Sequence, residues 1–95
     1  MTNKQTRKKR QGGQENFPEG KYLLILHNDD IHSFEYVINA LMEVCAHHFE
    51  QAVQCALITH HKGSCDVRKG TYKDIEKMKE AMVLKDLSVT INSQP

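Results

Sequence analysis

The stretch Tyr22-Leu23-Leu24-Ile25-Leu26-His27-Asn28-Asp29-Asp30 joins a short apolar run to a group of turn-forming residues. A run of this length that is bounded by polar residues is typical of a strand buried on both faces. Asn and Asp favour a turn after it because their short side chains hydrogen-bond to the neighbouring backbone. Since this run is the most apolar of the predicted strands, we expect it to lie in the middle of a sheet.

Two helices are predicted directly after this turn. Apolar residues recur at helical spacing over residues 34–45, and Ser33 suits the N-cap of that helix. Two adjacent histidines then interrupt the pattern, and a second helix follows that ends near Gly63, a residue suited to a helix C-terminus. The apolar face expected for the second helix consists of Phe49, Ala52, Val53, Ala56 and Leu57.

Two further strands and a third helix complete the predicted fold. Residues 64–68 and 87–91 alternate between apolar and polar side chains, as half-buried strands do. Between them, Thr71 and Asp74 form a variant of the capping box at the start of a short helix. The order β-α-α-β-α-β predicts an α+β fold. We expect a two-layer α/β sandwich, in which three helices cover a three-stranded antiparallel sheet.

Length and charge divide the chain into an extension and one domain. Its 95 residues suffice for a single small core, so we expect a flexible N-terminal extension at residues 1–20 and a core domain at residues 21–95. The first 20 residues carry five basic and two acidic side chains, against eight and ten in the rest. The near-neutral domain argues against a nucleic-acid partner. The basic segment favours a solvated tail, with a nucleic-acid-binding arm as the alternative.

Cysteine usage and hydropathy favour a cytoplasmic protein. The three cysteines are an odd number, and no apolar targeting segment precedes the domain, so we expect reduced thiols in the cytoplasm. Each cysteine falls where a small buried hydrophobic residue is expected. No stretch approaches the roughly 20 apolar residues that a membrane span requires. We therefore predict no membrane partner.

The sequence favours a binding protein over an enzyme. It contains no metalloprotease histidine pair, phosphate-binding loop, dinucleotide fingerprint or nucleophile elbow. Six histidines and three cysteines raise the question of zinc, but no Cys-x-x-Cys pair is present and adjacent histidines diverge on a helix. We expect no metal and no other cofactor. A small metal-binding or redox protein is kept as an alternative, as is a Cys/His nucleophile pair.

One group of polar residues can bind an amine. If the second helix packs beside the first strand, His60 approaches the turn formed by Asn28, Asp29 and Asp30. An ammonium group only donates hydrogen bonds, and these side chains offer carboxylate, amide and imidazole acceptors. The apolar floor beside them would consist of Phe34, Val37 and Ala56. Such a site could recognise the first residue of a chain. The alternative is an ordinary turn and a histidine placed favourably at a helix C-terminus.

Three blocks of sequence, in order and at matching spacing, resemble the ClpS adaptor family. They are Leu-His-Asn-Asp-Asp at 26–30, Phe-Glu-Tyr-Val-Ile at 34–38 and His-His-Lys-Gly-Ser-Cys at 60–65, and the resemblance extends from about residue 22 to residue 91. It implies an adaptor that binds N-degrons, which are destabilising N-terminal residues with bulky hydrophobic or aromatic side chains. The adaptor would deliver its substrates to an AAA+ Clp unfoldase of the ClpA or ClpC type, acting with the ClpP peptidase.

The resemblance also implies a role for individual residues. The substrate α-amino group would be bound by Asn28, Asp29, Asp30 and His60. The hydrophobic pocket would be lined by His32, Phe34, Val37, Ala56 and Thr59. The N-terminal domain of the unfoldase would contact Asp74 and Lys79. Phe34 and Ala56 stand where many members have methionine. The alternative function is a Clp-docking interaction module without amine recognition.

Overall fold

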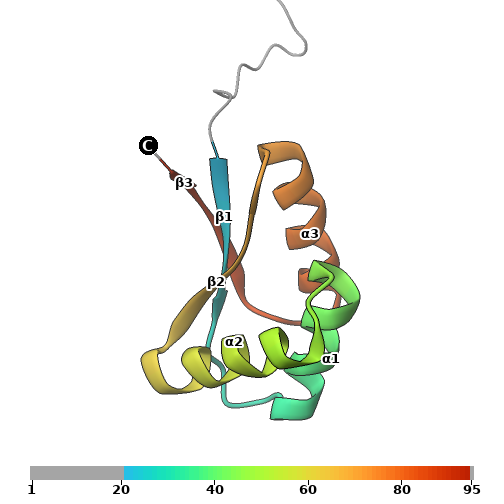
Figure 1. The fold of residues 1–95 in the computed structure, drawn as a ribbon, viewed down its shortest axis with the longest axis vertical. Coiled ribbons are helices and arrows are strands. Elements are labelled where there is room, and N and C mark those ends of the chain that lie inside the picture. The colour runs from blue at the N-terminus through green and yellow to red at the C-terminus, as the bar shows by residue number, and fades with distance from the viewer. Residues whose placement is uncertain (1–20, 95) are drawn as a thin grey trace, which may run out of the picture.

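In the computed structural model, which describes residues 21–94, three strands and three helices follow the predicted order (Figure 1). The predicted extension at residues 1–20 lies outside the described residues, as does Pro95. The elements are β1 (Lys21–His27), α1 (Phe34–Cys45), α2 (Phe49–Lys62), β2 (Ser64–Gly70), α3 (Tyr72–Leu84) and β3 (Val89–Gln94). The α+β fold class is therefore confirmed.

The sheet has the order β2-β1-β3, with β1 antiparallel to both neighbours. The predicted central position of the most apolar strand is thus confirmed. Leu26 pairs with Cys65 on one side and with Val89 on the other, so the C-terminal end of β1 is fixed by both flanking strands. The position of the Asn28–Asp30 turn, which follows β1, is therefore fixed by the pairing of the sheet.

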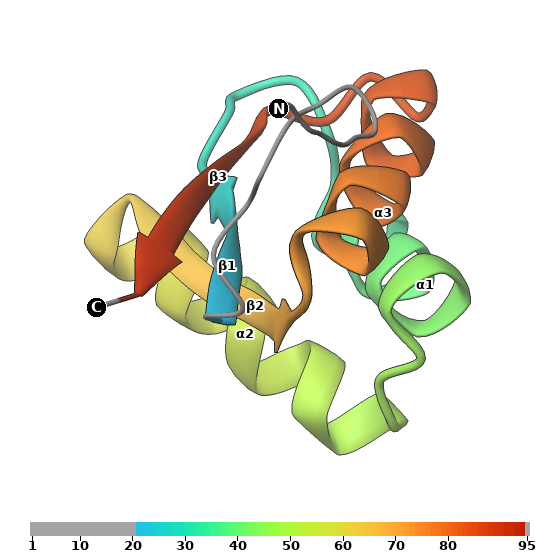
Figure 2. The same cartoon turned by 90° about the horizontal axis from the view of Figure 1, so that it is seen from above.

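The sheet alternates between a buried and a less buried face. Tyr22, Leu24 and Leu26 belong to the core that the helices complete, whereas Leu23 and Ile25 are half-buried on the opposite face. Figure 2 shows α1 and α3 together on one side of β1. The expectation that β1 is buried on both faces was wrong, because in this two-layer fold the helices leave one face of the sheet uncovered.

Two predicted helix caps are present. The Ser33 hydroxyl accepts a hydrogen bond from the Tyr36 N–H at 3.1 Å, and the Thr71 hydroxyl accepts one from the Asp74 N–H at 3.3 Å. Each cap satisfies an N–H that has no partner within its helix. The start of α1, and with it the entry to the pocket described below, is therefore set locally by Ser33.

The buried face of α2 differs from the prediction. Its buried residues are Ala52, Cys55, Ala56 and Thr59, whereas Phe49 is 60% exposed and Leu57 is 38% exposed. Small side chains on the inner face let a helix lie close to the sheet, and the larger apolar side chains are displaced toward solvent. The sequence pattern correctly predicted Ala52 and Ala56 on this face, but it missed Cys55 and the polar residue Thr59.

Two strand boundaries also differ from the prediction. β2 continues beyond residue 68 to Gly70, because its pairing with β1 extends back to Tyr22. β3 begins at Val89, so the buried Leu87 lies in the preceding loop, where its N–H donates to the Met82 carbonyl at 3.1 Å. The position of Leu87 becomes important at the pocket.

Candidate functional site

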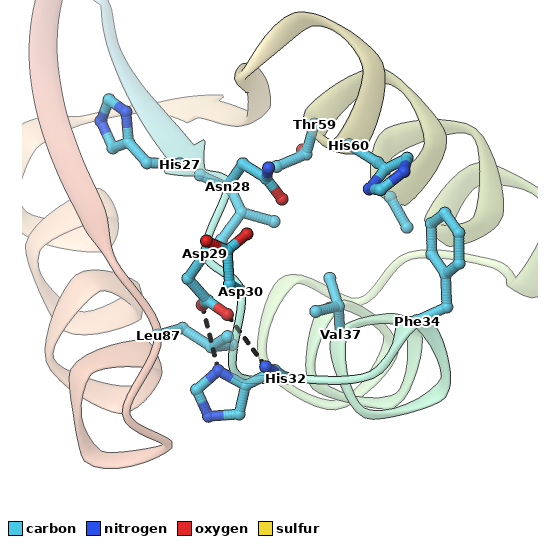
Figure 3. Close-up of a pocket in the computed structure, with 12 residues that line it drawn as sticks. His27, Asn28, Asp29, Asp30, His32, Phe34, Val37, Thr59, His60 and Leu87 are labelled. Carbon is cyan, nitrogen blue, oxygen red and sulfur yellow. Dashed lines mark hydrogen bonds and ion pairs between the residues drawn. The ribbon is translucent and has the colours of Figure 1, made fainter.

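A pocket of about 290 Å³ lies between the end of β1, the start of α1 and the last turns of α2 (Figure 3). All nine residues predicted for the amine site and the hydrophobic pocket line it, although they come from three separate segments. They are Asn28, Asp29, Asp30, His32, Phe34, Val37, Ala56, Thr59 and His60. The lining also includes Leu26, His27 and Leu87, which were not predicted.

Backbone hydrogen bonds bring these segments together. The Asn28 N–H donates to the Gly63 carbonyl at 2.9 Å, which joins the loop after β1 to the end of α2. The His27 N–H donates to the Ser88 carbonyl at 2.9 Å, which joins the end of β1 to the residues before β3. The last turn of α2, with Thr59 and His60, is therefore held beside the Asn28–Asp30 turn.

The two aspartates of this turn have different surroundings. Asp29 Oδ1 accepts hydrogen bonds from the N–H groups of Ile31 and His32, both at 2.9 Å, and Oδ2 lies 3.0 Å from His32 Nδ1. Burial acts to raise the pKa of Asp29, but these interactions with His32 and Ile31 outweigh it, so that its pKa is below the ordinary value. Asp29 therefore favours its charged form, and its hydrogen bonds to Ile31 and His32 hold the loop after β1 in a turn.

Asp30 is the carboxylate that remains available. Its side chain points into the space of the pocket beside that of Asn28, and His60 lies across from them (Figure 3). Within residues 21–94, no group donates a hydrogen bond to the Asp30 carboxylate or to the Asn28 side chain. The rim thus presents one carboxylate and one amide as acceptors for a ligand that donates.

The apolar part of the pocket lies beside this polar rim. Ala56 and Thr59 are almost fully buried at its base, and the Thr59 hydroxyl donates to the Cys55 carbonyl at 2.8 Å. Phe34 is 45% exposed at the mouth, where its ring centroid lies 5.4 Å from that of His60 at an interplanar angle of 55°. The mouth is therefore framed by two aromatic rings above a base of small side chains.

His32 borders the pocket, but its ring is turned away from the pocket centre and toward Asp29 (Figure 3). Of the lining residues that were not predicted, Leu26 and His27 directly precede the Asn28–Asp30 turn in the sequence. This position could have predicted that they border the pocket. Leu87 is 57 residues beyond Asp30, and no pattern in the sequence connects the two.

Asp74 and Lys79, the predicted docking residues, both lie on α3 and do not line the pocket. Asp74 is exposed in the first turn of the helix, and Lys79 is half-buried. The structure therefore separates the predicted docking residues from the predicted amine site.

The thiols are not set up for nucleophilic chemistry. All three cysteines are buried, and burial raises the pKa of Cys45 to about 11 and that of Cys65 to about 12. Thiols with such values are protonated at neutral pH and react poorly.

In the described part of the chain, no three His, Cys, Asp or Glu side chains are grouped so as to hold a metal ion. None of the helices within residues 21–94 is long and apolar enough to cross a bilayer.

The fold and the pocket together define a small α+β domain with an apolar pocket beside a polar rim. Residues 18–89 match the model of the family described as ATP-dependent Clp protease adaptor protein ClpS. The chain is 39% identical over 70 residues to the ATP-dependent Clp protease adapter protein ClpS of Neisseria meningitidis serogroup B, and the match covers 70% of this chain and 66% of that protein. It is 29% identical over 65 residues to the Streptomyces avermitilis protein of the same name, covering 68% and 62%.

A solved structure is similar as well. The structure of Agrobacterium tumefaciens ClpS2 bound to L-phenylalaninamide superimposes with a TM-score of 0.74 at 26% identity, covering 80% of this chain and 99% of that one. The chain belongs to the ClpS family. Its matched region spans slightly less than two thirds of the length of these curated relatives.

Proposed function

We propose that this protein is an adaptor that binds the N-terminal residue of N-degron substrates and delivers those substrates to a Clp unfoldase and its peptidase. The observation that carries the proposal is the pairing of unfilled acceptors on Asn28 and Asp30 with an apolar pocket directly beside them. This arrangement fits a ligand that has an ammonium group and a bulky apolar side chain on the same carbon atom.

The polar rim is suited to the ammonium group. Asp30 offers a charged acceptor, and Asn28 offers a neutral amide oxygen. His60 can accept through a ring nitrogen when the imidazole is neutral. A hydrogen bond that involves a charged group contributes about 1.5–3 kcal/mol. Because Asp29 is already engaged by its own loop, we assign it to shaping the site and assign the direct contact to Asp30.

The apolar part of the pocket is suited to the first side chain of a substrate. The cavity is surrounded by Val37, Ala56, Thr59 and Leu87. Its mouth is framed by the rings of Phe34 and His60. The relative from Agrobacterium tumefaciens was solved with L-phenylalaninamide, a ligand that has a free amine and a benzyl side chain. Membership in the same family supports a similar ligand class for this chain.

A binding experiment tests amine recognition. A fluorescent peptide that begins with Phe and has a free amine should bind, and the same peptide with an acetylated amine should not, because acetylation removes the charge and two donors. Equal affinity for the two peptides would falsify the proposal. A panel that shows no preference for the first residue would indicate a Clp-docking module without amine recognition.

A degradation experiment tests delivery. A fluorescent protein that begins with Phe is incubated with a purified Clp unfoldase of the ClpA or ClpC type and ClpP, with and without this protein. We expect faster loss of fluorescence with the adaptor, and no acceleration for a substrate that begins with Ala. Acceleration of both substrates to the same extent would contradict selection by the first residue.

A further inference from the structure

The wall of the pocket formed by Leu87 depends on a constrained turn. Leu87 is 4% exposed and lines the pocket from the loop between α3 and β3. Asp86, immediately before it, has φ 67°, in the left-handed region that residues other than glycine rarely adopt. Contacts that stabilise this turn therefore also determine where the Leu87 wall lies.

Two stacked rings contact this turn: His32, which lies just before α1, and Tyr36, in the first turn of α1. The Tyr36 hydroxyl donates to the Lys85 carbonyl at 2.6 Å, and His32 Nε2 lies 3.9 Å from Asp86 Oδ2. The His32 and Tyr36 rings stack with centroids 4.7 Å apart and 17° between their planes. Because the rings are in contact, each restricts the position of the other. Tyr36 holds residue 85 through its hydrogen bond, and His32 faces the carboxylate of Asp86.

The imidazole of His32 also contacts the Asn28–Asp30 turn, which is the amine-binding loop of the proposed function. Its Nδ1 contacts Asp29 Oδ2 (Figure 3), at a distance of 3.0 Å. The His32 side chain is only 12% exposed. The two ring nitrogens thus face two carboxylates from different loops: Asp29 next to the amine site, and Asp86 next to the Leu87 wall. An imidazolium donates through both nitrogens, whereas the neutral ring donates through one and accepts through the other.

We propose that His32 is a positioning residue that sets the width of the pocket by joining the Leu87 wall to the amine-binding loop. This inference rests on the proposed function, since it concerns the same pocket. His32 acts through Asp29 and through the turn at residues 85–86, with Tyr36 as its support. The expected consequence is that His32 helps to determine which size of first residue this protein prefers.

Relative affinities for peptides that differ only in the first residue test this role. We expect His32→Ala to release the wall and widen the pocket. The ratio of Kd for a Leu-first peptide to Kd for a Trp-first peptide should then rise at least threefold. A general loss of folded protein would weaken both peptides by the same factor and leave the ratio unchanged. His48→Ala is the matched control, because His48 is exposed, makes no capping hydrogen bond and does not line the pocket.

Tyr36→Phe provides a second, milder variant. It removes the hydrogen bond to the Lys85 carbonyl and keeps the stacked ring. If His32→Ala does not fold, Tyr36→Phe therefore tests whether contacts with this turn set the width of the pocket. We expect a smaller shift in the same direction, and a double variant whose shift is less than the product of the two single shifts. An unchanged ratio in a folded His32→Ala variant, or in Tyr36→Phe if only that variant folds, would overturn the positioning role. Failure of the unmodified protein to bind Phe-first, Leu-first and Trp-first peptides would instead overturn the proposed function, and the positioning role with it.

Discussion

At the scale of single residues, neighbouring carboxylates of identical chemistry have different surroundings. Asp29 accepts hydrogen bonds from its own loop, whereas Asp30 faces the pocket without a donor from residues 21–94. The sequence predicted both as amine ligands, because a run of Asn-Asp-Asp contains nothing that distinguishes the second residue from the third. The difference comes from the backbone path of the turn, which directs one side chain inward along the loop and the other into the cavity.

Asp30→Asn should weaken the binding of a Phe-first peptide about tenfold, since it replaces a charged acceptor of the ammonium group with a neutral one. The corresponding loss is ~1.5 kcal/mol, the lower part of the range for hydrogen bonds to charged groups. Fluorescence anisotropy measures the affinity, and circular dichroism shows whether the fold is retained. A folded variant with unchanged affinity would contradict the assignment of Asp30 to the amine.

Asp29 should contribute to stability in a way that depends on pH. Its pKa is lower in the folded protein than the ordinary value of 3.8, so the folded state favours the charged form. This contribution is present above the unfolded-state pKa and is lost as the pH falls through the lower folded-state pKa. The stability difference between the unmodified protein and Asp29→Asn, measured by urea unfolding, should therefore be larger at pH 6 than at pH 3. A difference that is constant over this range would show that the charge of Asp29 is not responsible.

At the scale of elements, α2 shows why the sequence predicted the presence of a helix better than its buried face. The helix ends at Lys62, just before Gly63, as expected, and Gly63 adopts φ 96°, which glycine adopts without a steric penalty. Ala52 and Ala56 were predicted on the inner face and are buried, but Cys55 and Thr59 were missed because they are small and one of them is polar. Hydrophobic periodicity gives most weight to large apolar residues, and here Phe49 and Leu57 are exposed.

The close packing of α2 predicts a cost for larger side chains on its inner face. Ala52 is fully buried, so Ala52→Leu should destabilise the protein by about 2 kcal/mol through overpacking. The neighbouring exposed residue supplies a matched control, and Gln51→Leu should change the free energy of unfolding by less than about 0.5 kcal/mol. Urea denaturation measures both variants. Equal effects at the two positions would show that α2 does not pack tightly at Ala52.

At the scale of the whole molecule, the predicted docking residues and the pocket lie on different elements. The pocket forms where β1 ends, whereas α3 follows β2, whose last residue, Gly70, pairs with Tyr22 near the start of β1. The start of α3, whose first turn includes Asp74, therefore lies near the start of β1 and not near its end (Figure 1). The order of the elements was predictable from local patterns. The contribution of Leu87 was not, because it depends on how the loop before β3 returns to the end of β1.

This separation predicts that substrate binding and delivery can be disrupted independently. Charge reversal at both proposed docking positions, with Asp74→Lys and Lys79→Glu in one variant, should leave the affinity for a Phe-first peptide within about twofold, since neither residue lines the pocket. The same variant should lose most of its ability to accelerate degradation of a Phe-first substrate, because like charges placed across a protein interface oppose binding. His60→Ala should behave differently: it should weaken peptide binding and reduce delivery in proportion to the peptide left unbound. If the charge-reversed variant delivers substrate as well as the unmodified protein does, the unfoldase must contact a surface other than Asp74 and Lys79.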